Sequence, residues 1–348
     1  MIQTLTIPSV IEANGLDLDG VSSGLIDGLK LFHEDSLPYI IGDLAIREGV
    51  SPHKTINSSP GDKDYKLLAH AALLVAAKNV EGSLCVTTGF PFFNYQLFRQ
   101  KAYDFFQDNH HIRYDASAFS HTSLSEQNIS VVKAMVIPEL QGCDIAIRKS
   151  GATEDGAFFL VSLGYGTFEA ALSLPSGIVQ RTAVSGPGVR YAVQSAIREL
   201  LKTYNIGLNA EHMFDQGFRT GKIVLNRDVI NIEELRRKHL TIYFNEVIAP
   251  LLAKTFSDKD YLSCSKLILV GGGALYEDLQ ASFKKEFDDV LEVEMHPEPS
   301  LCASRGYAIH SKINSEEINA SPVGIDIGNA TTVLSLYKDQ KESNNPFS

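Results

Sequence analysis

From Val323 to Thr332 the sequence reads VGIDIGNATT, an apolar run that ends in a carboxylate and is followed directly by a glycine turn. The pattern predicts a β-hairpin with strands at Val323–Ile327 and Thr331–Tyr337. Successive backbone N–H groups in such a turn suit phosphate oxygens, and Gly328 lets a ligand approach the backbone closely. Asp326 can hold Mg²⁺ through the water shell that this ion retains. An ordinary hairpin with a polar turn is the alternative interpretation.

A second strand–turn–strand pattern, SLGYGTFE, occupies Ser162 to Glu169. The apolar runs on its two sides, Phe158–Leu163 and Phe168–Leu174, predict another hairpin. Its turn, Gly164-Tyr165-Gly166-Thr167, offers backbone amides of the same kind. One glycine hairpin is weak evidence for a phosphate site, but two in one chain favour a pair of loops that clamp a polyphosphate from both sides.

A third glycine motif follows a predicted buried strand at Leu267–Val270 and reads Gly271-Gly272-Gly273-Ala274. The dinucleotide fingerprint requires a further glycine where Tyr276 stands, so a Rossmann site is disfavoured. The sequence GxxxxGK[ST] is absent, which excludes a P-loop of that type. A flat glycine surface would instead let an adenosine lie against the backbone.

Length and composition predict a soluble protein of two domains. The chain has 348 residues, with 44% hydrophobic and 21% charged residues. No apolar stretch reaches the ~18 residues that a membrane-spanning helix needs. The opening segment has no signal-peptide features, so we expect a cytoplasmic protein. The net charge of -11 disfavours direct contact with nucleic acid or an anionic membrane and favours a basic protein partner.

The cysteine and histidine pattern gives no metal site. Cys85, Cys143, Cys264 and Cys302 form no CxxC pair, so we expect free buried thiols and no zinc. The pair His110-His111 is expected to be exposed and idle.

Together, the three glycine motifs resemble the two phosphate loops and the adenosine loop of the superfamily that contains actin, heat-shock chaperones and sugar kinases. Within it, other segments are similar to the ParM-type plasmid-segregation actins. These are Ile41–Ala45, Val86–Pro91 with Tyr95, Val136–Glu139, Thr182–Val189 and Ala303–Tyr307. The resemblance covers nearly the whole chain.

The resemblance implies an α/β, two-domain actin-like (ribonuclease H-like) fold with a central nucleotide cleft. Residues 1–150 plus 316–348 would form domain I, with the phosphate loop 1 hairpin at its C-terminal end. Residues 151–315 would form domain II, with phosphate loop 2 and the adenosine loop. In the family the DxG hairpin opens the protein, whereas here it closes the sequence, so the order of elements predicts a circular permutation.

The family match also implies ATP and Mg²⁺ as ligands. Asp326 would hold the metal through water, and Glu139 would orient the attacking water, so these two are the expected catalytic residues. The residues expected to contact the nucleotide are Gly328, Asn329, Ala330, Thr331, Ser162, Gly164, Tyr165, Gly166, Thr167, Gly188, Gly271, Gly272, Gly273 and Ala274.

Two departures from the family pattern bear on the chemistry. Ser162 stands where relatives carry an acid, which predicts slow hydrolysis or a water bound by Ser162 instead. Val333 stands where many relatives carry a lysine, although an aliphatic residue there is compatible with ATP binding. The basic run Arg236–Lys238 would either contact the nucleotide or form a solvated helix face.

The function expected from the resemblance is a slow ATPase that polymerises into filaments in a nucleotide-dependent way. It would serve plasmid or DNA segregation, or another bacterial cytoskeletal role, through a basic DNA-binding adaptor protein. The alternative is a weakly hydrolysing nucleotide-binding scaffold of the same superfamily, which Ser162 favours. A small-molecule kinase is disfavoured because no substrate base is identifiable.

Overall fold

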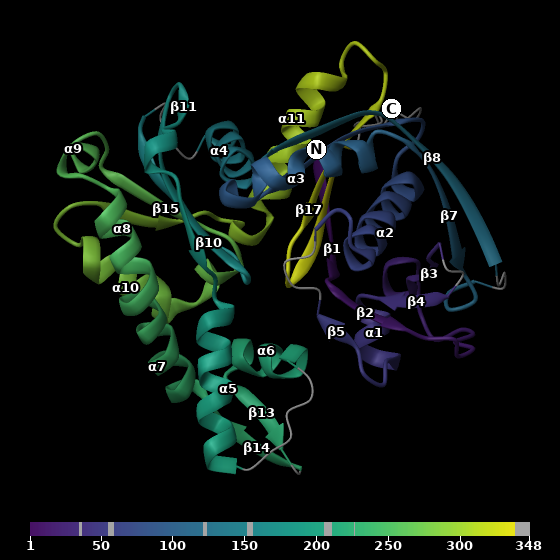
Figure 1. The fold of residues 1–348 in the computed structure, drawn as a ribbon, viewed down its shortest axis with the longest axis horizontal. Helices are drawn as coiled ribbons and strands as arrows, with labels where there is room; N and C mark the ends of the chain where they lie inside the picture. The colour runs from purple at the N-terminus through teal and green to yellow at the C-terminus, as the bar shows by residue number, and fades with distance from the viewer. Residues whose placement is uncertain are drawn as a thin grey trace, which may run out of the picture.

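The computed structural model describes residues 1–34, 37–54, 59–120, 124–151, 156–204, 211–225 and 227–337. In this part of the chain two lobes stand side by side, each built on its own β-sheet (Figure 1). The first lobe holds the N-terminal elements together with the last hairpin of the described chain. The second lobe holds the elements between them in sequence.

The first lobe contains a ten-stranded sheet in the order β1-β18-β17-β6-β8-β7-β3-β4-β2-β5. Its strands are β1 (Ile2–Pro8), β2 (Val10–Ala13), β3 (Lys30–Phe32), β4 (Pro38–Ile41), β5 (His53–Lys54), β6 (Leu84–Phe90), β7 (Asn109–Asp115), β8 (Leu124–Pro138), β17 (Ser321–Ile327) and β18 (Thr331–Tyr337). The long strand β8 joins two halves of the sheet, since residues 131–138 pair in parallel with β6 and residues 124–130 pair antiparallel with β7.

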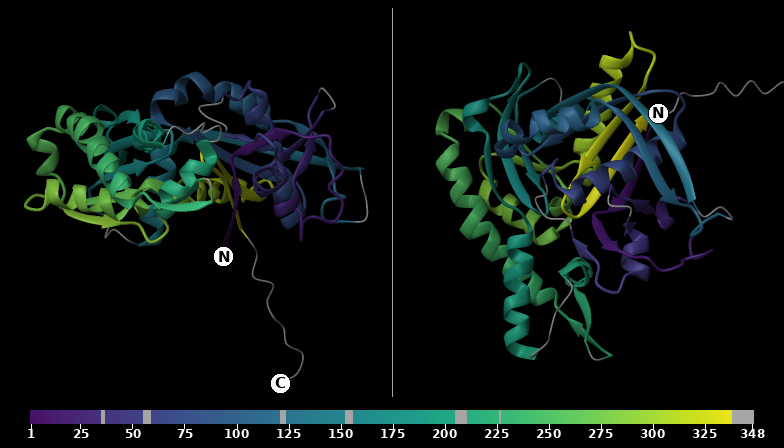
Figure 2. Two further views of the ribbon diagram at one scale, coloured as in Figure 1. Left: turned by 90° about the horizontal axis from the view of Figure 1, so that it is seen from below. Right: turned by 45° about the vertical axis from the view of Figure 1, so that its right-hand side comes forward.

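The hairpin β17–β18 lies inside this sheet, between β1 and β6, although it comes last in the described sequence (Figures 1 and 2). β17 pairs in parallel with β6, and β18 pairs antiparallel with β1. In the β1–β18 register Ile2 stands opposite Tyr337. The two ends of the described chain are therefore neighbours in one sheet.

Helix α2 (Lys63–Asn79) forms the centre of the first core. Nine of its ten buried residues follow one another closely between Leu67 and Ala76 because the helix is enclosed by sheet and loops. Helix α3 (Phe92–Phe106) begins directly after β6 and contacts both β6 and β8. The remaining helical elements of this lobe are η1 (Ile26–Gly28) and α1 (Asp43–Glu48).

The second lobe is built on a six-stranded sheet in the order β11-β10-β9-β15-β16, with β12 also paired to β10. These strands are β9 (Phe158–Leu163), β10 (Thr167–Leu174), β11 (Gly177–Ile178), β12 (Val184–Pro187), β15 (Lys266–Val270) and β16 (Glu292–Met295). A separate hairpin, β13 (Lys222–Leu225) and β14 (Asp228–Asn231), lies at the far end of this lobe (Figure 1). Both predicted glycine hairpins, β9–β10 and β17–β18, are thus present in the structure.

The second lobe also contains helical elements. They are η2 (Gln180–Thr182), α5 (Arg190–Tyr204), α6 (Glu211–Thr220), α7 (Glu233–Tyr243), η3 (Phe244–Ile248), α8 (Ala249–Thr255), α9 (Asp258–Tyr261), η4 (Gly272–Leu275), α10 (Glu277–Phe287) and η5 (Pro299–Leu301). η3 is a π-helical turn that separates α7 from α8 and ends two residues before Pro250. Proline lacks the N–H and crowds the carbonyl four residues earlier, and the wider turn relieves that conflict.

Two helices connect the lobes and cross each other. α4 (Glu139–Ser150) follows β8 and shares a core with β9 and β15 of the second lobe. α11 (Cys302–Ser315) returns to the first lobe and packs on β17 and β6. At the crossing, a Cβ added at Gly306 would overlap the carbonyl oxygen of Gly142, so both backbones need a residue without a side chain.

Replacing Gly306 with alanine is expected to lower the free energy of unfolding by about 2–3 kcal/mol, since backbone atoms rather than a flexible side chain block the added methyl. Denaturant unfolding followed by circular dichroism measures the change. Gly24→Ala is the matched control, because a Cβ there would meet nothing within 4 Å. Equal stability of the two variants would contradict this account of the crossing.

The histidine expectation is wrong in part. His110 is 7% exposed and its Nδ1 lies 3.4 Å from Nε2 of His70. Because side chains alternate in direction along β7, His110 points inward, whereas His111 is exposed and forms a hydrogen bond with the Asn128 side chain. Burial lowers the pKa of both members of the buried pair, that of His70 to about 4.

All four cysteines are free, as expected, and three are buried, while Cys264 is half-buried. Among the described residues no helix is both long and apolar enough to traverse a bilayer.

Candidate functional site

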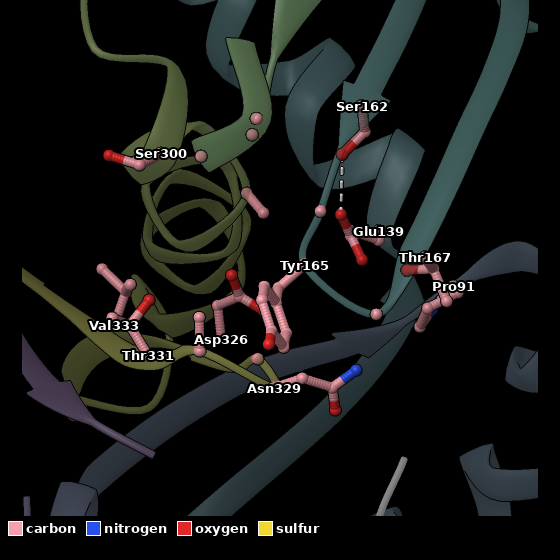
Figure 3. A pocket seen from close by; sticks show the side chains of 18 of the residues that line it. Pro91, Glu139, Ser162, Tyr165, Thr167, Ser300, Asp326, Asn329, Thr331 and Val333 are labelled. Atoms are coloured by element: carbon pink, nitrogen blue, oxygen red, sulfur yellow. Dashed lines mark hydrogen bonds between the residues drawn. The ribbon is translucent and has the colours of Figure 1, made fainter. Parts of the chain in front are cut away.

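A cavity of about 540 Å³ lies between the two lobes. Its walls come from both hairpin turns, from the glycine run after β15, and from the first residues of the connecting helices α4 and α11. Figure 3 shows Asp326, Asn329 and Thr331 on one side, with Glu139, Ser162 and Thr167 on the other. The spatial arrangement expected from sequence, two glycine turns from separate lobes around one space, is present.

The turn between β17 and β18 is held in shape from outside the cavity. Its glycine, Gly328, donates its N–H to the carbonyl oxygen of Thr331 at 3.0 Å. Ser9 donates its hydroxyl to the Gly328 carbonyl at 2.6 Å and its N–H to the Ala330 carbonyl at 3.0 Å. In a trans peptide the C=O and the following N–H point in opposite directions. Ser9 therefore turns the N–H groups of Asn329 and Thr331 away from itself.

The turn between β9 and β10 has the same closing bond, from the Gly164 N–H to the Thr167 carbonyl at 2.9 Å. Three consecutive N–H groups that open α5, those of residues 188–190, donate to the carbonyls of Gly166, Gly164 and Tyr165 at 2.9–3.0 Å. These bonds turn the N–H groups of residues 165–167 away from α5. The two turns thus present backbone donors in the same way, each fixed by a different partner.

Glycine is required at both turns. A Cβ at Gly164 would lie 2.7 Å from the Thr167 carbonyl oxygen, and one at Gly328 would lie 2.9 Å from the Thr331 oxygen. Gly271 has φ of +81°, and a Cβ there would lie 2.7 Å from the backbone of Leu163. The left-handed conformation and the close crossing of β9 both exclude a larger residue at Gly271.

The polar floor of the cavity is acidic. Ser162 donates its hydroxyl to Glu139 Oε1 at 2.9 Å. Burial raises the pKa of Glu139, and the Ser162 hydrogen bond opposes that rise. Burial, together with the negative charge of Glu139, raises the pKa of Asp326 to about 8. A cation placed between these groups would be favoured, because it would offset both the burial and the repulsion of the carboxylates.

A third carboxylate, Glu169, stands directly opposite Ser162 in the β9–β10 register and is fully buried. It accepts hydrogen bonds from the Phe92 N–H at 2.5 Å and from the Ser185 hydroxyl at 2.7 Å. Burial raises its pKa well above the usual range. Among the described residues no cluster of three or more acidic, histidine or cysteine side chains is arranged to ligate a metal directly.

Most of the residues singled out in the sequence line this cavity, and Gly188 and Ala274 do not. Gly188 lies behind the second turn, where a Cβ would be 2.5 Å from the Gly164 oxygen. Ala274 is fully buried in the core of the second lobe. The lining set is Glu139, Ser162, Gly164, Tyr165, Gly166, Thr167, Gly271, Gly272, Gly273, Asp326, Gly328, Asn329, Ala330 and Thr331.

Sequence reasoning missed several parts of the wall. Tyr65 of α2 and Asn94 of α3 line it from the first lobe, and Asp215 and Arg219 of α6 line it from the second. These four lie on helices, where no glycine turn or other local motif marks a ligand site. Ser9 was also missed, because its role depends on pairing with a turn that lies more than 300 residues away.

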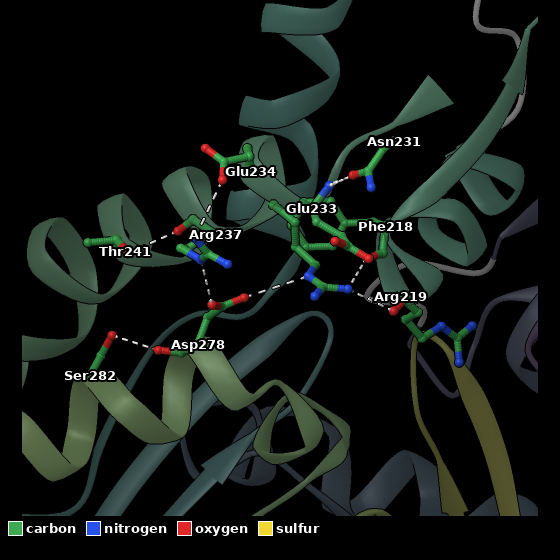
Figure 4. A network of polar contacts seen from close by, with 10 residues as sticks. Phe218, Arg219, Asn231, Glu233, Glu234, Arg237, Thr241, Asp278 and Ser282 are labelled. Carbon is green, nitrogen blue, oxygen red and sulfur yellow. Dashed lines mark hydrogen bonds and ion pairs between the residues drawn. The ribbon is translucent and has the colours of Figure 1, made fainter. Parts of the chain in front are cut away.

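A polar hollow adjoins the cavity at Arg219, Leu275 and Tyr276. Figure 4 shows its network: Arg237 approaches Asp278, and Arg219 lies at the edge toward the cavity. Arg236 Nη1 donates to the Arg219 carbonyl at 3.1 Å and its Nε lies 3.7 Å from Asp278. Arg236 is 22% exposed and Arg237 is 63% exposed, so only the second resembles a solvated helix face.

Known proteins resemble the chain in sequence and in structure. Residues 2–142 match the family described as "Actin like proteins N terminal domain". No curated protein matches the sequence.

Among solved structures, a ParM subunit of a 15-stranded filament from Clostridium botulinum is 15% identical, with a TM-score of 0.68 over 88% of this chain and 92% of that one. Ta0583, an archaeal actin homolog in complex with ADP, is 16% identical, with a TM-score of 0.68 and the same two coverages. A non-polymerisable quadruple mutant of pCBH ParM is 17% identical, with a TM-score of 0.71, again over 88% and 92%. The chain therefore has the two-domain actin-like fold of ParM-type proteins, and its residues 2–142 carry the match to the actin-like N-terminal domain.

Proposed function

We propose that this protein binds ATP in the cavity between its lobes, hydrolyses it slowly, and assembles into filaments whose growth depends on the bound nucleotide. One observation supports this most: two glycine turns from separate lobes, closed by the same hydrogen bond, face one cavity that also contains Asp326 and Glu139. The actin homolog Ta0583 was solved with ADP.

The phosphates would lie between the two turns. The backbone N–H groups of Tyr165, Gly166 and Asn329 point away from α5 and Ser9, which hold the two turns in place. They would donate to phosphate oxygens. Gly271–Gly273 would face the nucleoside, and the base would extend toward the hollow beside Arg236. An arginine is suited to this position because its planar guanidinium stacks on aromatic rings.

The acidic floor fits Mg²⁺ held mainly by phosphate and water. Magnesium bound with a nucleotide typically takes one or two carboxylates and keeps several waters. Asp326 provides such a carboxylate, and burial followed by the charge of Glu139 raises its pKa. When bound, the ion would neutralise phosphate charge during transfer. Asp326 would orient that ion's water shell, and the turn amides would hold the terminal phosphate in place.

Glu139 would orient the attacking water, and Ser162 would fix the position of Glu139 through the hydrogen bond between them. Phosphoryl transfer depends mostly on positioning and charge stabilisation. Ser162 supplies no charge of its own, and this supports slow turnover. Because both lobes would contact the nucleotide, loss of the terminal phosphate would change their relative angle by a hinge motion.

The cellular role and the partners belong to the same proposal. Self-association is supported by the likeness to a ParM filament subunit. We propose plasmid or DNA segregation, or another bacterial cytoskeletal task, in the cytoplasm, with contact to DNA through a basic adaptor. The net charge of -11 favours such an adaptor over direct DNA binding. We also retain residues 1–150 plus 316–348 and residues 151–315 as the proposed domains.

A nucleotide-binding scaffold with little hydrolysis is the second candidate, and the uncharged Ser162 favours it. Purified protein would be incubated with ATP and Mg²⁺ while phosphate release, light scattering and electron micrographs are recorded, with ADP and no nucleotide as controls. ATP-dependent filaments with phosphate release support the motor. Binding without turnover supports the scaffold, and no binding of either nucleotide contradicts both.

The order of elements supports a circular permutation of the actin-like fold, since β17–β18 lies between β1 and β6 in a sheet whose other strands come from residues 2–138. A rearranged variant would begin at Ser321, join Tyr337 to Met1 through a short glycine-serine linker, and end at Ser315. Ile2 stands opposite Tyr337, so the linker spans only neighbouring strands. Its free energy of unfolding is expected within about 2 kcal/mol of the parent. Failure to fold, measured by circular dichroism, would contradict this prediction.

A further inference from the structure

A buried ion pair joins the two lobes on the side of the cavity away from the crossing helices. Lys54, the last residue of β5, places its Nζ 2.6 Å from Oδ2 of Asp215 on α6. Lys54 belongs to the sheet of the first lobe, and α6 packs within the second lobe. The side chains are 4% and 3% exposed. Figure 1 shows β5 and α6 close together, with α4 and α11 at the opposite end.

The same cluster contacts the wall of the cavity. Lys54 Nζ lies 4.0 Å from the ring centroid of Tyr165, in the turn between β9 and β10. Arg219 Nη2 lies 3.2 Å from the same Asp215 oxygen. Tyr165, Asp215 and Arg219 all line the cavity. One side chain of the first lobe therefore touches two lining groups of the second.

The energetics of the pair make it selective for the closed arrangement. Exposed ion pairs contribute little, but when a buried pair loses one partner, the other charge stays out of water with fewer compensating contacts, which is unfavourable. If the lobes separate, both charges return to solvent and the ammonium also leaves the Tyr165 ring. The geometry of the pair and of the ring can be satisfied only when β5 and α6 are in contact.

From these contacts we propose that Lys54 and Asp215 form a latch that closes the two lobes over the cavity and positions Tyr165 within it. The inference rests on the proposed function in one respect, namely that the ligand released by opening is a nucleotide. Entry and release of that ligand require separation of β5 from α6, so the strength of this pair sets the exchange rate. Lys54 and Asp215 are positioning residues and take no part in the chemistry.

The test compares Lys54→Met, Asp215→Asn and the double variant with the parent protein. Release of a fluorescent ATP analogue is followed by stopped flow, and small-angle X-ray scattering is recorded without nucleotide. Each single variant is expected to release the analogue at least about tenfold faster. The double variant should be no faster than the singles, because the two residues act as one unit. The radius of gyration of the empty protein should increase in all three.

Lys63→Met is the matched control. Lys63 Nζ lies 4.7 Å from the Tyr39 ring centroid and donates to the Tyr39 hydroxyl at 2.8 Å, and both residues belong to the first lobe. This variant also loses a lysine beside a tyrosine, but release and radius of gyration should stay unchanged. Arg219→Met removes the other cationic partner of Asp215. It should not reproduce the larger radius of gyration, and this outcome distinguishes loss of the Arg219–Asp215 contact from loss of the Lys54–Asp215 contact.

Unchanged release and unchanged radius of gyration in Lys54→Met would overturn the latch. Additive effects of the two substitutions on release would do so as well, since independent contacts add and a latch does not. If the parent protein binds no nucleotide, the proposed function fails, and the scattering measurement alone then decides whether the pair closes the lobes.

Discussion

Replacing Glu139 with glutamine is expected to lower the rate of ATP hydrolysis by about a hundredfold or more, the usual size of a lost general base. Affinity for ATP should stay within about threefold. Glutamine has the same shape and its carbonyl oxygen can still accept the Ser162 hydroxyl, which lies 2.9 Å from Glu139 Oε1. Only the negative charge that orients and activates the water is lost. Phosphate release under saturating ATP, together with the dissociation constant, checks both parts.

Ser162→Ala provides the control for this prediction. It removes the hydrogen bond that holds down the pKa of Glu139, so the carboxylate should ionise at higher pH. The pH–rate profile is expected to shift toward alkaline pH, with the maximal rate reduced much less than in Glu139→Gln. A glutamine variant that hydrolyses ATP at the parent rate would exclude Glu139 from the reaction.

The glycine turns could be predicted from sequence because their chemistry is local. Gly164 and Gly328 each donate to a threonine carbonyl three residues later, and a Cβ at either would meet that same oxygen. The four-residue segment from each glycine to its threonine therefore contains the turn and also the carbonyl oxygen that excludes a side chain at the glycine. The strands beside them are short apolar runs, and the glycine turns that flank them identify these runs as strands.

The supports of those turns could not be predicted in the same way. Ser9 and the opening of α5 hold the turn carbonyls, but a serine after a strand and a valine before a helix have no local signature. The pairing of Lys54 with Asp215 spans 161 residues in sequence and depends on how the lobes close. Such contacts follow from tertiary packing, which residue type and spacing do not specify.

Sequence periodicity does not mark every element. Residues 233–255 are helical, but a π-helical turn ahead of Pro250 divides them, as expected where a proline would disrupt a continuous helix. The first half of β8, residues 124–130, is largely polar because it forms part of an open sheet edge region with β7, and it was not predicted. Helix α3 has aromatic residues around much of its circumference, so no single apolar stripe marks it.

Binding of Mg²⁺–ATP should strengthen as the pH rises from about 6 to about 8 and level off above that, because Asp326 must lose a proton before it can serve the ion. In the empty protein burial, followed by the charge of Glu139, raises the pKa of Asp326 to about 8. Below that pH the bound state holds fewer protons than the free state, so raising the pH favours binding, by up to about tenfold per unit. Isothermal titration calorimetry at several pH values in two buffers measures both the affinity and the released proton.

Asp326→Asn is expected to remove this pH dependence together with the magnesium-dependent part of the affinity, by about tenfold to a hundredfold at pH 8. Asparagine keeps the size of the side chain but has no proton to release and no charge for the ion. Glu139→Gln should instead keep the pH dependence of Mg²⁺–ATP binding and move its midpoint to lower pH. The charge of Glu139 is one of the two causes that raise the pKa of Asp326, and this variant removes it. If the Mg²⁺–ATP affinity of the parent protein is the same at every pH between 6 and 8, Asp326 is already ionised in the empty protein. This result would contradict the proposed link between loss of its proton and binding of the ion.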